Sequence, residues 1–162
     1  LVSIIGIDRF KGGYNAAKLA QERTLLEGPL PVRIVRAAQF HEFIEPVVGW
    51  TIQDGVANVQ EMRMQPVAAT AVAETLADAV EEPEIENGRI TEVAGPREET
   101  LADAAAALFA SRGESVEIRE SRGGPLAEPD DPDAAAYAEG AALPNPGAKL
   151  AGPTFEEWLA AA

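Results

Sequence analysis

Tyr14 and Lys18 are the two side chains whose types and spacing point most directly to chemistry. Four residues apart on a helix, they would share one face, one turn from each other. A free phenol has a pKa of about 10 and transfers protons poorly near neutral pH, but an ammonium close by favours the phenolate and lowers that pKa. Such a pair could protonate a carbonyl oxygen as hydride arrives, or take the proton from an alcohol in the reverse direction.

Ser3 could complete this arrangement, because a hydroxyl near the same oxygen would orient it. It precedes Tyr14 in the sequence and lies on a predicted strand. A Tyr-x-x-x-Lys pair arises by chance in roughly 4% of sequences with this composition, so the motif alone is weak. Its context strengthens it, because the pair opens a helix directly after a strand that bears a serine.

The elements around the pair predict a βαβ unit. Five of the residues 1–7 are apolar, β-branched side chains dominate and there is no alternation, which is typical of a buried parallel strand. Residues 14–27 form a predicted helix that Gly28 and Pro29 end, and residues 32–37 form a second strand. Short connections then predict two parallel strands. A buried strand needs neighbours on both sides, so we also expect a segment upstream of Leu1.

Helices and strands alternate along the rest of the chain. The predicted helices span residues 41–53, 69–82 and 98–112, and the predicted strands or extended pieces span residues 56–59, 63–67, 89–94 and 115–118. Thr154 and Glu157 form a capping box for a terminal helix.

We therefore expect an α/β fold in two parts. Residues 1–60 would be the C-terminal part of a doubly wound, parallel, Rossmann-like sheet, and residues 61–162 a smaller α/β lobe on the substrate side. Ligands in such folds bind at the carboxyl ends of the strands, which here means the segments after Ile7 and after Ala37.

Composition excludes several classes of site. The net charge of -14, from 27 acidic and 13 basic residues, argues against binding to nucleic acid. The absence of cysteine excludes disulfides, thiolate catalysis and zinc–thiolate sites, and a single histidine excludes a multi-histidine metal site, so we expect no metal. No apolar run is long enough for a membrane span and no signal peptide is visible, so we expect a soluble, cytoplasmic protein without a membrane partner.

Several segments carry a family resemblance. They are the run from Ser3 to Arg9, the stretch from Gly13 through Tyr14 and Lys18 to Glu22, the stretch from Pro31 to Phe43, and the shorter pieces Gln65-Pro66-Val67, Ala94-Gly95-Pro96 and Thr154 to Leu159. Together they resemble the active-site region and C-terminal lobe of atypical, NmrA-like short-chain dehydrogenases/reductases. The resemblance covers nearly the whole chain and is loosest between residues 120 and 152.

The resemblance implies an NAD(P)-dependent oxidoreductase that reduces a carbonyl or an activated double bond of a small molecule. The alternative is a cofactor-sensing relative that regulates a partner without chemistry. Tyr14 would be the general acid/base, Lys18 would tune Tyr14 and bind the nicotinamide ribose, and Ser3 would orient the carbonyl. The cofactor would be NAD or NADP, with NADP favoured.

The resemblance also places residues around the nicotinamide. Ala38, Gln39 and Phe40 would line its side of the site. His41 could contact the substrate, although a lone histidine at a helix start is more often a cap or packing residue.

The sequence departs from the family in its glycines. No Gly-x-Gly-x-x-Gly follows a strand, and the closest cluster, Gly12-Gly13, lies on a different loop. The pyrophosphate cradle and the residue that selects NAD or NADP are therefore missing. We expect the isolated chain to bind dinucleotide poorly and a further segment or chain to supply the N-terminal half of the Rossmann domain. A non-catalytic fragment or interaction module is the remaining hypothesis.

Overall fold

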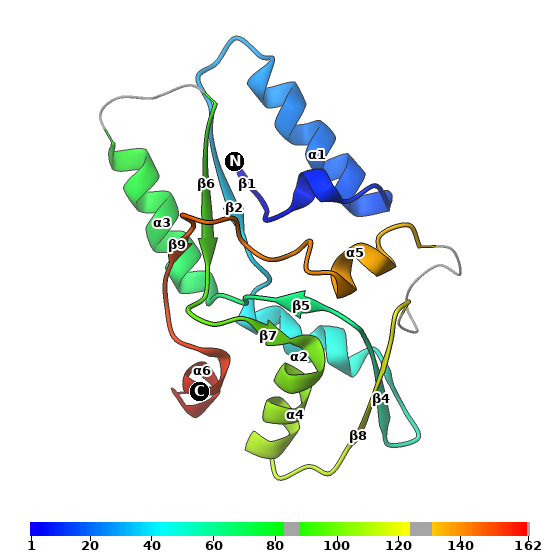
Figure 1. The fold of residues 1–162 in the computed structure, drawn as a ribbon. Coiled ribbons are helices and arrows are strands. Elements are labelled where there is room, and N and C mark those ends of the chain that lie inside the picture. The colour runs from blue at the N-terminus through cyan, green and yellow to red at the C-terminus, as the bar shows by residue number, and fades with distance from the viewer. Residues whose placement is uncertain (83–87, 124–130, 162) are drawn as a thin grey trace.

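A four-stranded parallel sheet forms the centre of this computed structural model, which describes residues 1–82, 88–123 and 131–161 (Figure 1). Its strands are β1 (Val2–Ile4), β2 (Arg33–Ala37), β6 (Arg89–Ala94) and β9 (Lys149–Leu150), in the order β1-β2-β6-β9. All three neighbouring pairs are parallel. Helix α1 (Gly13–Leu26) joins β1 to β2. The α/β class and the parallel βαβ unit are therefore confirmed.

The first strand is shorter than the predicted strand of residues 1–7. Gly6 adopts a left-handed backbone with φ of 72°, and the short 3-10 helix η1 (Ile7–Arg9) follows. A Cβ on Gly6 would collide with the carbonyl oxygen of Ala141, so only glycine lets that segment approach. Ile5 and Ile7 are fully buried. The apolar run thus predicted burial correctly and strand length wrongly.

Helices cover both faces of the sheet. Val35 of β2 packs in a core with Ala71 and Val72 of α3 (Ala69–Glu81), whereas its neighbour Arg36 binds Glu22 of α1. Successive residues of a strand point to opposite faces. Helices α1 and α3 therefore lie on opposite sides of the sheet, as Figure 1 shows.

A second core lies beside the sheet. Helices α2 (His41–Gly49), α4 (Leu101–Ser111) and α6 (Phe155–Ala161) contribute to it, with a small sheet of β3 (Ile52–Gln53), β4 (Val56–Gln60) and β8 (Glu117–Ser121). Its buried side chains include Ile44, Val59, Leu108 and Phe155. The strands β5 (Arg63–Met64) and β7 (Glu99–Thr100) form a separate pair, and α5 (Ala134–Ala138) is a short helix. No helix in the described parts of the chain is long and apolar enough to cross a membrane.

Several helices and strands begin or end at residues other than the predicted ones. The predicted helix 41–53 ends at Gly49, because Asp54 and Gly55 turn the chain with positive φ angles into the hairpin β3–β4. The predicted helix 98–112 begins at Leu101, where the Thr100 hydroxyl accepts a hydrogen bond from the Asp103 N–H at 3.0 Å. The predicted strand 115–118 shifts to β8, which pairs in parallel with β4.

The central sheet takes strands from both sides of residue 60. β6 and β9 come from the predicted lobe of residues 61–162, yet they continue the sheet that β1 and β2 begin. β9 is only two residues long, and no sequence pattern predicted it.

Candidate active site

One face of the sheet carries a row of polar side chains. Ser3 of β1 pairs in register with Arg36 of β2, which pairs with Glu92 of β6. Side chains in register on neighbouring strands point to the same face, which here is the face that α1 covers. Glu22 of α1 binds Arg36 through both carboxylate oxygens, at 3.0 Å to Nε and 2.7 Å to Nη2. Glu22 is only 2% exposed, so a buried ion pair attaches α1 to the sheet.

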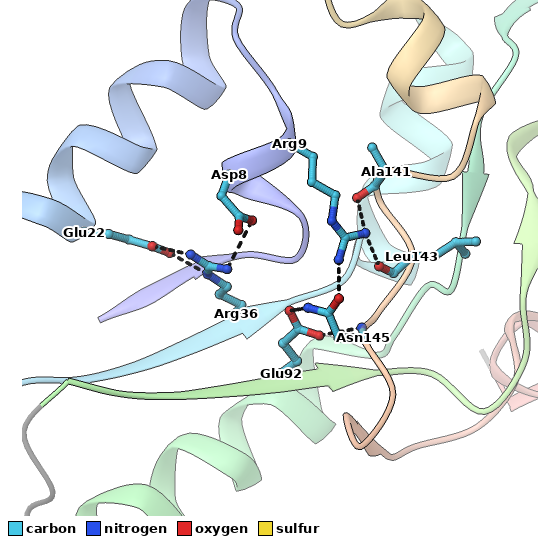
Figure 2. A network of polar contacts seen from close by, with 8 residues as sticks. All are labelled: Asp8, Arg9, Glu22, Arg36, Glu92, Ala141, Leu143 and Asn145. Carbon is cyan, nitrogen blue, oxygen red and sulfur yellow. Dashed lines mark hydrogen bonds and ion pairs between the residues drawn. The ribbon is translucent and has the colours of Figure 1, made fainter.

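Arg36 also reaches the loop after β1. Its Nη1 lies 3.3 Å from Oδ1 of Asp8, so one guanidinium joins α1, β2 and η1 (Figure 2). The hydrogen bond to Glu22 raises the pKa of Arg36 above its ordinary value, in spite of burial. The guanidinium is therefore a fixed positive charge under the helix that bears the predicted catalytic pair.

Tyr14 and Lys18 lie on the first two turns of α1, at the predicted spacing. The Tyr14 side chain is 72% exposed and open to solvent. Lys18 is half-buried, and its Nζ donates a hydrogen bond to Oε1 of Gln21 at 2.8 Å. Among the described residues no hydrogen bond joins Tyr14 to Lys18. The structure thus places the pair on one helix, with the Lys18 ammonium hydrogen-bonded to Gln21.

Ser3 lies under α1 and is only 3% exposed. Its hydroxyl has no hydrogen-bond partner among the described residues. An unpaired buried hydroxyl costs roughly 1–3 kcal/mol, so this group is poised to accept a partner. The structure does not join it to Tyr14 by a hydrogen bond in the part of the chain that it describes.

The segment Ala38-Gln39-Phe40 continues from β2 in an extended form. The Ala38 N–H donates to the carbonyl of Val93 at 3.0 Å, and the Gln39 carbonyl accepts from the Val67 N–H at 2.9 Å. Phe40 forms a bridge with Val67. Gln39 also has a buried side-chain oxygen, Oε1, without a partner among the described residues. The segment is therefore fixed at the carboxyl end of β2 and offers one unused acceptor.

His41 is buried at the start of α2. Its Nε2 lies 3.1 Å from the carbonyl oxygen of Pro153, and its ring contacts Phe155 and Trp158 at centroid distances of 5.4 and 5.7 Å. Burial lowers the pKa of His41 below its ordinary value, so the ring is neutral near pH 7. These contacts give His41 a packing role, and substrate contact stays a prediction.

A segment that the sequence did not single out crosses the carboxyl end of β1. Arg9 donates from Nη1 to the carbonyls of Ala141 and Leu143 at 3.2 and 3.1 Å, and from Nη2 to Asn145 (Figure 2). Asn145 in turn donates from its backbone and side-chain nitrogens to Glu92 at 2.7 and 2.8 Å. Residues 141–145 lack the periodicity of a helix or strand, so no local signal announced these contacts.

Two cavities lie elsewhere in the described residues. One of about 490 Å³ is lined by Arg97, Glu98, Glu99, Asp103 and Glu156, with alanines of α4. The other, of about 270 Å³, lies between α3 and the sheet and is lined by residues that include Arg33, Asp78 and Lys149. Neither is lined by a residue of the predicted site.

Comparison with known proteins bears on the fold. No family model and no curated protein sequence matches the chain. An NADPH-dependent quinone oxidoreductase from Escherichia coli superposes with a TM-score of 0.74 at 16% identity, over 99% of this chain and 65% of that one. A UDP-glucuronic acid 4-epimerase from Bacillus cereus, solved with UDP-glucuronic acid and NAD, has a TM-score of 0.65 at 14% identity, over 99% and 58%. A nucleoside-diphosphate-sugar epimerase from Staphylococcus aureus has a TM-score of 0.64 at 13% identity, over 98% and 62%.

The fold is Rossmann-like. At these identities the likeness shows the fold alone, and it agrees with the predicted fold class. The chain spans less than two thirds of the length of the three proteins that it resembles.

Proposed function

We propose that this chain carries the proton-transfer residues of an NAD(P)-dependent oxidoreductase of the NmrA-like type, which reduces a carbonyl or an activated double bond. The observation that carries the proposal is the position of Tyr14. It lies on the first turn of the helix that follows β1, at the end of the parallel sheet where ligands bind in this fold. The matching structures include proteins solved with NADPH or NAD, which supports the same cofactor class here.

The residues present fit the nicotinamide end of a dinucleotide. Tyr14 and Lys18 offer a hydroxyl and an ammonium for ribose hydroxyls, and Gln39 offers a buried oxygen without a partner. A carboxamide N–H is a suitable donor to that oxygen. The glycine-rich turn that holds the pyrophosphate is not among these residues.

The reaction needs two transfers. A reduced nicotinamide, when bound, would supply the hydride that the carbonyl carbon receives. Tyr14 donates its phenolic proton to the carbonyl oxygen as that oxygen gains charge, which leaves an alcohol and a phenolate. Lys18 stabilises the phenolate, and the Ser3 hydroxyl orients the carbonyl through a hydrogen bond that it otherwise lacks.

We propose that a further strand of the cofactor domain pairs with the outer edge of β1. The Leu1 carbonyl and the Ile5 N–H bond to β2, so the backbone groups of Val2 and Ile4 point to the other side. An open strand edge is a template for a further strand. A Gly-rich strand–turn–helix, from a further segment or another chain, would extend the sheet there and supply the pyrophosphate site.

Loss of the Lys18 ammonium tests this proposal. In the full-length protein we expect oxidation of NADPH or NADH with a panel of quinones, aldehydes and enones, followed by the absorbance of the reduced nicotinamide. Lys18→Met should lower kcat by at least about tenfold, since general acid–base catalysis contributes roughly 10²–10⁴-fold. The matched control is Lys149→Met, which removes an ammonium bound to Asp78 outside the site and should leave kcat unchanged. Equal rates in both variants would refute the role of Lys18.

A cofactor-sensing protein is the second candidate. The hydrogen bond of Lys18 to Gln21 favours it, because the ammonium is then engaged away from the Tyr14 hydroxyl. This function predicts that the full-length protein binds NAD(P)H with the same affinity in the wild type and in Lys18→Gln, and turns over no member of the panel.

A further inference from the structure

Asp133 holds the loop that leads into α1. Its Oδ1 accepts a hydrogen bond from the Lys11 N–H at 2.6 Å, and its Oδ2 accepts one from the Gly12 N–H at 2.9 Å. The side chain is buried, with 3% of the residue exposed. A carboxylate from near the far end of the chain is therefore enclosed against the two residues that precede the helix.

Asn15 extends this contact into the helix. Its Nδ2 lies 3.3 Å from Oδ2 of Asp133 and donates to the hydroxyl of Tyr137 at 2.9 Å. The Tyr137 ring packs on Phe10 at a centroid distance of 4.5 Å. Asn15 follows Tyr14 directly and is one of only two residues of α1 that are buried among those described. The residue beside Tyr14 is thus fixed from two sides by the segment that contains α5.

Helix α1 has no side-chain cap of its own. Its N-cap is Gly12, which cannot accept a hydrogen bond through a side chain. The N–H groups of a first helical turn lack partners inside the helix and carry partial positive charge. Asp133 supplies the missing carboxylate from 121 residues away. The turn that contains Tyr14 therefore depends on a residue of the other part of the chain.

We propose that Asp133 is a positioning residue for Tyr14. With Asn15 it fixes the first turn of α1 and so sets where the Tyr14 hydroxyl stands at the carboxyl end of β1. Tyr14 itself is exposed and makes no hydrogen bond of its own among the described residues, so its position comes from the backbone that Asp133 holds. This inference rests on the proposed function, because it assigns Asp133 a part in the same proton transfer.

The test is a double-mutant cycle in the full-length protein. Asp133→Asn keeps the volume of the side chain but replaces one carboxylate oxygen with an NH₂ group. That group cannot accept the hydrogen bond that a backbone N–H donates to the carboxylate. We expect kcat for NAD(P)H oxidation to fall about tenfold, with the dissociation constant of the cofactor changed less than twofold. In a Tyr14→Phe background the same substitution should change kcat less than twofold, because the residue through which Asp133 acts is gone. The control Asp103→Asn removes a carboxylate at the start of α4, and should leave kcat unchanged.

A purely structural role gives a different result. Asp133→Asn would then lower kcat by the same factor in the wild-type and Tyr14→Phe backgrounds, which overturns the inference and leaves the proposed function standing. A Tyr14→Phe variant with wild-type kcat overturns the proposed function instead, and the inference falls with it.

Hydrogen exchange gives a readout that does not need activity. Asn15→Ala is a milder change, which can be used if Asp133→Asn does not fold. It should speed amide exchange in residues 11–17 about tenfold relative to the exchange in the control variant Asp103→Asn. Unchanged exchange in this segment in both Asn15→Ala and Asp133→Asn would overturn the inference whether or not the protein turns over.

Discussion

Replacing Arg36 with methionine tests how helix α1 is held on the sheet. Methionine fills much of the same space but leaves the Glu22 carboxylate, 2% exposed, without its partner. Removing one member of a buried ion pair costs roughly 3–5 kcal/mol. Since a domain of this size is stable by about 5–15 kcal/mol, Arg36→Met should remove roughly a fifth or more of the free energy of unfolding.

The assay is urea unfolding of the wild type and three variants, followed by circular dichroism. The double variant Glu22→Leu/Arg36→Met removes both charges and should recover most of the loss, because an apolar pair often replaces a buried ion pair at little cost. The control is Lys149→Met, which breaks an exposed pair with Asp78 and should cost less than about 1 kcal/mol.

A double variant no more stable than Arg36→Met would contradict this reasoning. So would a cost below about 1 kcal/mol for Arg36→Met, because the Glu22 carboxylate would then be solvated. Either result would mean that the ion pair does not attach α1 to β2, and the position of Tyr14 would need another explanation.

Three further predictions concern single residues. His41 has a lowered pKa and is neutral in the fold, so the free energy of unfolding should fall as the pH drops below 6.5. Urea unfolding should show this pH dependence in the wild type and not in His41→Gln. Burial raises the pKa of Tyr137, so stability should fall as pH rises above 10; in Tyr14→Phe, where Tyr137 is the remaining tyrosine, the tyrosinate absorbance should rise with a midpoint above 10.0. Gly95→Ala should cost about 1–3 kcal/mol in urea unfolding because its Cβ would collide with the carbonyl of Pro66, whereas Gly49→Ala, which meets open space, should cost nothing.

Short sequence patterns predicted the elements whose stabilising residues lie close together in the sequence. The apolar runs around Val2 and Val35, with the Gly28-Pro29 stop between them, were enough to predict the parallel unit β1-α1-β2. The capping box was also confirmed, since Thr154 Oγ1 accepts from the Glu157 N–H at 3.2 Å and Glu157 Oε2 from the Thr154 N–H at 2.8 Å. Each of these signals is complete within a few residues of sequence.

Partners that are distant in the sequence could not be predicted in this way. Glu22 looks like one of several charged residues of α1, and only the fold shows that Arg36 meets it under the helix. Asp133 and Asn145 lie in a stretch rich in alanine, glycine and proline without periodicity, so no sequence pattern predicted their contacts with the loop after β1. The spacing of the candidate pair was visible in the sequence, whereas the groups that hold it were not.

The turnover of Tyr14→Phe in the full-length protein tests the central claim most directly. The substitution removes one hydroxyl from an exposed side chain, so it should leave the fold unchanged. Loss of one hydrogen bond to the ribose should weaken the binding of NAD(P)H by no more than about tenfold. We expect kcat for NAD(P)H oxidation to fall by about 10²-fold or more, because the proton donor is lost. Cofactor binding and kcat both equal to those of the wild type would contradict the assignment of Tyr14 as the general acid.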